Sequence, residues 1–79
     1  MTSKNSENFQ KIESLLIESL NKVSEYIDDK DHKDVQEYIN HQEYGVAWEL
    51  LWCILVDKQV IIPESMRISV RMMRLGTDQ

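Results

Sequence analysis

Acidic side chains are concentrated in one block of this 79-residue chain. Residues 25–49 carry eight acids and two bases, whereas residues 1–24 are neutral and residues 50–79 carry a charge of +1. The net negative charge of this block is therefore larger than that of the whole chain, which is −5. Carboxylates at this density can bind a cation or a basic protein surface, and they repel nucleic-acid phosphates. We expect a protein partner and no nucleic acid.

Catalytic and metal-binding chemistry find little support in the residue types and spacings. The aspartates of residues 28–34 lack the central glycine and the closing glutamate of an EF-hand loop. His32 and His41 are nine positions apart on either side of a short predicted helix, which does not suit a shared metal site. Ser65 and Ser69 have no evident base, and no glycine-rich phosphate loop or nucleophile motif occurs. We therefore expect no enzymatic activity, no metal and no cofactor.

Length and composition predict one small domain. Residues 1–79 are too few for two cores, and 42% apolar with 29% charged residues is typical of an ordinary globular chain. We expect the ends, residues 1–6 and 77–79, to be frayed. No secretory signal begins the chain, and the apolar run Leu50–Val56 is far shorter than the roughly 20 residues that span a bilayer. A cytoplasmic protein without a membrane partner is the expectation.

Apolar residues recur at spacings of three and four, which is the period of one-sided helices. The pattern predicts an all-α fold, a small four-helix bundle with three main helices and one short helix. The expected helices cover residues 7–27, 32–40, 43–57 and 63–75. Ser6, Asp31 and Pro63 are expected to begin three of them, and Gly76 to follow the last.

The third predicted helix, Glu43–Asp57, is expected to be the centre of the core. Its apolar residues cover most of the circumference, which favours a helix covered from more than one side. Trp52 and Cys53 are accordingly expected to be buried. Gly45 suggests a close approach by the short second helix, and Asn40 is the candidate for a left-handed turn residue between them.

The segment from Val35 to Leu51 resembles a known family. Its helix is followed by Glu43-Tyr44-Gly45-Val46-Ala47-Trp48-Glu49-Leu50-Leu51, and then by an apolar loop, a helix that begins with proline, and a terminal Leu-Gly pair. With these residues the chain is similar to the MafI-like immunity proteins of bacterial polymorphic toxin and contact-dependent growth inhibition systems. The resemblance covers about residues 31–76. Two positions differ from the family's habit: residues 40–42 contain no glycine, and Ile62 stands where a capping serine is common.

The resemblance implies an immunity protein that binds and neutralises the C-terminal domain of a cognate toxin. Such toxins are frequently nucleases (RNases or tRNases), whose basic surfaces an acidic protein can cover. Taken with the charge map, it predicts a partner-binding surface formed by Asp28, Asp29, Asp31, Asp34, Glu37, Tyr38, Glu43 and Tyr44.

A second interpretation is a homodimeric helical adaptor or regulator without a toxin partner, in which surplus apolar surface is buried by self-association. Either a monomer or a weak homodimer is compatible with the sequence. Arg67, Arg71 and Arg74 form a row on the last helix, which is more typical of a solvated face than of an anion site. Met66, Met72 and Met73 are expected to fill the core.

Overall fold

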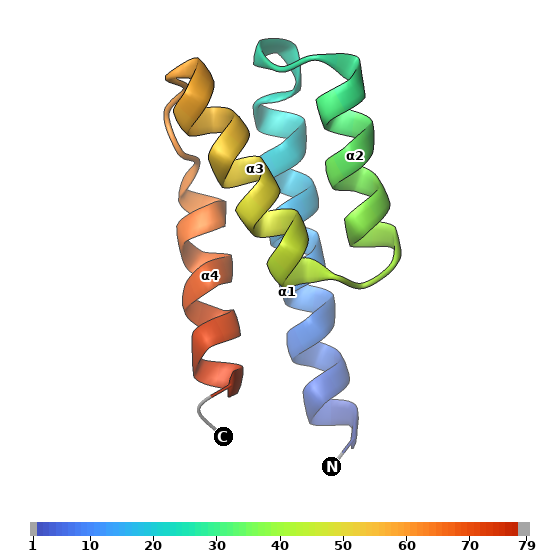
Figure 1. Cartoon of the computed structure of the whole chain (residues 1–79). Helices are drawn as coiled ribbons and strands as arrows, with labels where there is room; N and C mark the ends of the chain where they lie inside the picture. The colour runs from blue at the N-terminus through green and yellow to red at the C-terminus, as the bar shows by residue number, and fades with distance from the viewer. Residues whose placement is uncertain (1, 78–79) are drawn as a thin grey trace.

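The computed structural model describes residues 2–77, and within them the side chains of residues 9–73. The four α-helices are α1 (Thr2–Lys22), α2 (Asp29–Asn40), α3 (Tyr44–Lys58) and α4 (Glu64–Thr77), as Figure 1 shows. A single 3₁₀ turn, Ser24–Tyr26, lies between α1 and α2. Residues 2–77 contain no strand, so the predicted all-α four-helix bundle is confirmed.

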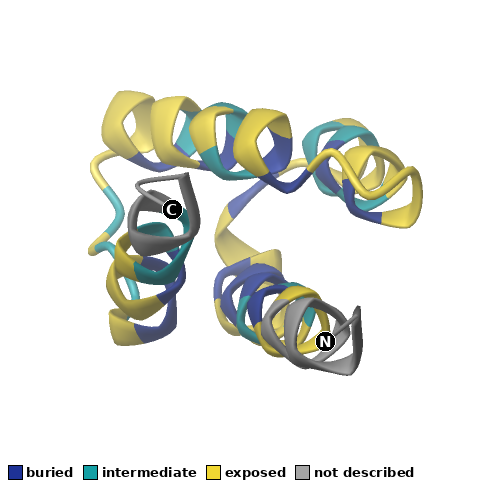
Figure 2. Ribbon diagram, turned by 90° about the horizontal axis from the view of Figure 1, so that it is seen from below, coloured by how far each residue is buried: buried dark blue, intermediate teal, exposed yellow. Residues whose placement is uncertain are grey.

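The helices form two antiparallel pairs that pack as two layers. α1 lies against α4, and α2 lies against α3 (Figures 1 and 2). Each helix directs one apolar line between the layers, because residues three and four apart share a helix face. The buried apolar residues are Ile12, Leu16, Leu20, Val23, Ile27, Val35, Ile39, Tyr44, Ala47, Leu51, Leu55 and Met66.

Several predicted helix boundaries are wrong. α1 begins at Thr2, ahead of the expected cap Ser6, and it ends at Lys22, not near Ile27. Ile27 is still buried, but from an extended segment with φ −123° and ψ 162°. α2 begins three residues earlier than expected. The carboxylates of Asp29 and Asp31 in its first turn are stabilised by the positive end of the helix dipole, which favours this earlier start.

The last helix also differs slightly from the prediction. Pro63 precedes α4 instead of forming its first residue, and its carbonyl accepts a hydrogen bond from the Met66 N–H at 3.1 Å. The helix continues to Thr77, past the expected stop at Gly76. Residues 1, 78 and 79 of the expected frayed ends lie outside the described residues.

Left-handed backbone occurs at Gln42 (φ 64°) and Gln59 (φ 59°), not at Asn40. Gln42 follows His41, the C-cap residue of α2, and its N–H donates to the Ile39 carbonyl at 3.0 Å. The Glu43 N–H donates to the Tyr38 carbonyl at 2.9 Å and closes the turn. α2 ends at Asn40 as predicted, but its C-cap residue His41 is not left-handed, so the left-handed residue falls at Gln42.

α3 forms one of the two layers together with α2 and is covered by the other layer on one side only, so the prediction that it is the central helix is wrong. Its buried line is the expected one, Tyr44, Ala47, Leu51 and Leu55. Its opposite side faces solvent along the whole helix (Figure 2). Trp52 is 41% exposed, Val56 is 53% exposed, and Cys53 is exposed. A Cβ on Gly45 would meet no atom within 4 Å, so this glycine serves no close approach to α2.

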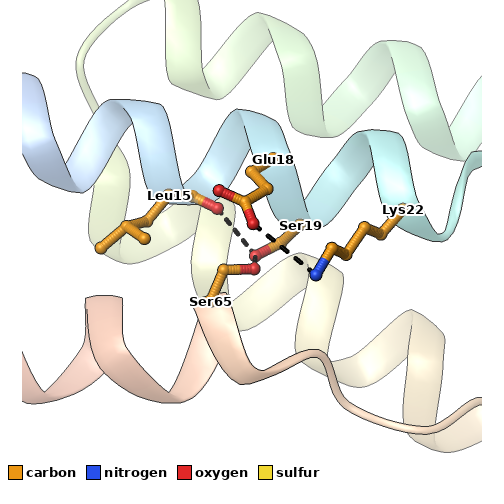
Figure 3. Close-up of polar contacts among 5 residues, drawn as sticks. All are labelled: Leu15, Glu18, Ser19, Lys22 and Ser65. Atoms are coloured by element: carbon orange, nitrogen blue, oxygen red, sulfur yellow. Dashed lines mark hydrogen bonds and ion pairs between the residues drawn. The ribbon is translucent and has the colours of Figure 1, made fainter.

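A buried hydroxyl pair joins α1 to α4 (Figure 3). The Ser19 hydroxyl donates to the Leu15 carbonyl at 2.8 Å, so the Ser65 hydroxyl donates to Ser19 Oγ at 2.6 Å. Both serines are buried, and no buried side-chain N or O atom of the described residues lacks a partner. Because serine side chains are short, α1 and α4 can lie close together at this point. The hydrogen bonds satisfy both buried hydroxyls.

Substitution of these serines should reveal their dependence on each other. Ser19→Ala removes the acceptor of the Ser65 hydroxyl and should lower the free energy of unfolding by about 1–3 kcal/mol. The double variant Ser19→Ala/Ser65→Ala should be more stable than Ser19→Ala, because no buried hydroxyl is then left unpaired. Urea unfolding of the wild type, Ser19→Ala and the double variant measures these free energies. A double variant that is less stable than Ser19→Ala would contradict this account.

Candidate partner-binding surface

An open groove of about 520 Å³ lies between α2 and the first half of α3. We call it the acidic groove. Three carboxylates and one aromatic ring line it together with an imidazole and an apolar side chain. The lining residues are Asp34, Glu37, Tyr38, His41, Glu43 and Leu50. Four of the eight predicted partner-binding residues are therefore brought together: Asp34, Glu37, Tyr38 and Glu43.

Helix periodicity and one tight turn position these side chains. Asp34, Tyr38 and His41 are spaced by four and three residues, so they follow one side of α2. The turn after α2 then reverses the chain, and the hydrogen bond from the Glu43 N–H to the Tyr38 carbonyl holds it at 2.9 Å. Glu43 thereby returns beside the end of α2, although it belongs to the start of the next helix.

The acidic groove carries an uncompensated negative charge. Asp34 lies 4.0 Å from the Lys30 ammonium, at the outer limit of an ion pair, and both groups face solvent. Glu37 and Glu43 are in none of the ion pairs formed by the described side chains. Exposed ion pairs of this kind contribute little to folding stability, and salt weakens them further. The carboxylates are therefore free to face a basic partner.

His41 and Leu50 also line the acidic groove, although they were not predicted as binding residues from the sequence. His41 Nδ1 lies 2.8 Å from the Glu37 carbonyl oxygen, which can only accept, so Nδ1 carries a hydrogen and donates. The seven-residue spacing from Asp34 to His41 was the available signal for this residue. Leu50 comes from α3 and had no such signal, because its place depends on how α3 packs against α2.

The aspartates at the start of α2 do not join the acidic groove as a group. Asp28 lies at the far end of α2, where its carboxylate is 3.9 Å from the Lys58 ammonium at the end of α3. Asp29 is roughly 140° around the helix from Asp34 at 100° per residue. Asp31 is half-buried and lies one turn before Asp34 on the same side of α2.

Tyr44, the eighth predicted residue, is buried in the core instead of lining the acidic groove. Its hydroxyl donates to Glu13 Oε1 of α1 at 3.3 Å, and its ring centre lies 6.3 Å from that of Phe9. Burial raises the pKa of the Tyr44 hydroxyl above its usual value of 10.0, and the negative charge and hydrogen bond of Glu13 raise it further. Tyr44 therefore ties α3 to α1.

Tyr44 should make folding stability depend on pH in the alkaline range. Its folded pKa is raised, so its contribution is complete below pH 10.0 and is lost as pH rises through the folded pKa. Tyr44→Phe should lower the free energy of unfolding by about 1 kcal/mol near neutral pH and flatten its alkaline decline. Urea unfolding between neutral pH and pH about 11 measures this. The exposed Tyr26→Phe serves as the control, and equal alkaline slopes for both variants would contradict the assignment.

Two further properties concern metals and membranes. Within the described residues, no three or more His, Cys, Asp or Glu side chains lie close enough to hold a metal ion. Among the helices of residues 2–77, none combines the length and the apolar character needed to cross a membrane.

In the part of the chain that is described, the acidic groove brings together four of the predicted partner-binding residues. The acidic groove is its most distinctive polar feature, because carboxylates from two helices converge there on an exposed ring. Comparison of the chain with protein-family models, with curated proteins and with solved structures gives no match.

Proposed function

We propose that this chain is an immunity protein, similar to the MafI-like group, that binds and neutralises the C-terminal domain of a bacterial toxin. The observation that carries the proposal is the acidic groove, where Asp34, Glu37 and Glu43 surround the partly exposed Tyr38. The combination of charge and an amphipathic ring suits a protein partner with a basic surface.

A nuclease domain is the partner that this chemistry fits best. Enzymes of this kind hold phosphates with lysine and arginine side chains, and carboxylates can occupy the same positions. Opposite charges accelerate the encounter, while the bound protein excludes the nucleic acid. Tyr38 is 37% exposed, so its ring can still bury apolar area and donate a hydrogen bond on binding.

The proposed mechanism is stoichiometric occlusion, with no catalytic step. The protein would act in the cytoplasm of the producing cell, where the toxin domain would reach its nucleic-acid substrate. Growth protection would then depend on the amount of immunity protein relative to the toxin, because each copy occupies one toxin domain.

Co-expression tests this function directly. The toxin domain encoded immediately upstream of the gene should arrest growth when expressed alone, and this chain should restore growth. The two purified proteins should form a complex in size-exclusion chromatography. A catalytically inactive toxin variant provides the control for toxicity of expression itself. Arrest that persists despite equal expression of both proteins, with no complex formed, would refute the proposal.

A further inference from the structure

A second groove, of about 710 Å³, lies between α3 of one layer and α4 of the other. We call it the arginine groove. The two helices diverge from the short loop that joins them, so the first half of α3 lies away from the second half of α4 (Figures 1 and 2). α3 accordingly packs less closely on α4 than on α2. The arginine groove lies where the two helices diverge, on the opposite flank of α3 from the acidic groove.

Apolar side chains form the walls of the arginine groove. Trp48 and Trp52 line it from α3, and Val70 and Met73 line it from α4. The two indole rings are stacked, with centres 5.2 Å apart and planes inclined by 13°. The Trp48 N–H donates to the Met66 carbonyl at 2.8 Å, which holds the rings against α4. The walls are therefore formed before any partner binds, and they gain from burial against an apolar surface.

Charged side chains border the arginine groove. Arg67 and Arg71 are one helical turn apart on α4, and Glu49 lines the groove from α3. All three are exposed, and none belongs to an ion pair of the described side chains. The sequence favoured a solvated face for this arginine row. The structure places two of its members beside an exposed aromatic pair, and arginine and aromatic residues are enriched at protein interfaces.

We propose that the arginine groove binds an amphipathic helical segment of a partner protein, with two acidic residues one turn apart along one edge of its apolar face. Two diverging helices leave room for a third helix to lay its apolar face between them. Acidic residues four positions apart have the same rise of about 6 Å as Arg67 and Arg71, so each carboxylate can meet one guanidinium. A basic residue on the other edge would face Glu49. Gly45 lies at one end without a side chain, so the segment can continue past it.

The charges favour this partner over a nucleic acid or a basic protein. Glu49 lies in the arginine groove and the chain has a net charge of −5, so a strand with one phosphate per nucleotide would be repelled. A basic protein, the partner proposed for the acidic groove, would meet Arg67 and Arg71 with like charge. A segment with two acids on one edge and one base on the other matches both borders.

The inference does not depend on the proposed function, because the two grooves lie on opposite flanks of α3. A chain that fails to neutralise a toxin can still bind an acidic segment. Variants of Arg67 and Arg71 that lose this binding should still neutralise the toxin, so failure of one proposal leaves the other standing.

Tryptophan fluorescence tests the inference, because both tryptophans of the chain line the arginine groove. The probe is a synthetic peptide, stapled as a helix, with leucines on one side and two glutamates one turn apart along its edge. Its titration should change the emission of the wild-type chain to saturation. A matched peptide with lysines in place of the two glutamates should bind about tenfold more weakly, because it meets two guanidinium groups with like charge.

Charge reversal tests the assignment to the two arginines. The variant Arg67→Glu/Arg71→Glu should bind the glutamate peptide about tenfold more weakly than the wild type, and it should prefer the lysine peptide. Lys11→Glu/Lys22→Glu changes the net charge equally at exposed positions of α1, and it should leave both affinities within about twofold of the wild type. Circular dichroism checks that both variants are folded.

Three outcomes would overturn the inference. An emission that the glutamate peptide does not change, or equal affinities for the two peptides, would show that the arginine groove does not recognise an acidic segment. Tighter binding of an oligothymidylate would assign the groove to nucleic acid. Sedimentation of the chain alone as a dimer, with Arg67→Glu/Arg71→Glu monomeric, would assign the groove to a second copy.

Discussion

Replacement of Leu51 by alanine is expected to lower the free energy of unfolding by about 3–5 kcal/mol, whereas Trp52→Ala should cost only about 1–2 kcal/mol. Leu51 is completely buried between the layers, so its removal leaves a cavity. Trp52 is 41% exposed and loses mainly its stacking on Trp48. The smaller residue is thus the more important one for stability.

Chemical denaturation at a protein concentration where each variant is monomeric measures both effects. This condition matters because self-association would add apparent stability to any variant that undergoes it. Val56→Ala, on the exposed side of the same helix, is a matched control and should change stability by less than about 1 kcal/mol. A larger loss for Trp52→Ala than for Leu51→Ala would contradict the placement of α3.

Reversal of three charges in the acidic groove should have the largest effect on recognition. Asp34→Lys, Glu37→Lys and Glu43→Lys together are expected to reduce the association rate with the toxin domain by about 100-fold at low salt. The three side chains are exposed or half-buried, so the helices should remain intact. The loss should shrink as ionic strength rises, because salt screens the attraction in the wild-type complex.

A matched triple variant separates local charge from net charge. Glu18, Glu25 and Glu64 are exposed and lie outside the acidic groove, and their reversal to lysine changes the net charge by the same amount. Stopped-flow binding should show a small effect for this control and a large one for the groove variant. Equal rates for the two triple variants would mean that the acidic groove is not the binding surface.

The helix content and most of the buried lines of α1 and α3 followed from the sequence. The residues of α3 spaced by three and four, Tyr44, Ala47, Leu51 and Leu55, were expected on one line and are buried. In α1 the same period predicted the burial of Leu16 and Leu20. Periodicity is a local property, because the position of a side chain around a helix depends only on its number in the helix.

The acidic block was also evident from the sequence, but the groups that meet within it were not. Asp34 and Glu43 line one groove, while Asp28 pairs with Lys58 at the opposite end of the same two helices. The turn at Gln42 decides this separation, since its left-handed backbone returns Glu43 to the end of α2. Charge counts along a chain cannot contain that information.

The amount of cover on α3 was decided only by the tertiary structure. Its apolar circumference predicted neighbours on several sides, yet the two-layer arrangement leaves Trp52, Cys53 and Val56 exposed. Composition determines which surfaces gain from burial, because the hydrophobic effect depends on apolar area. Which of those surfaces one chain can cover depends on how its other helices are shared between the layers, and here α1 and α4 cover one side of α3 only.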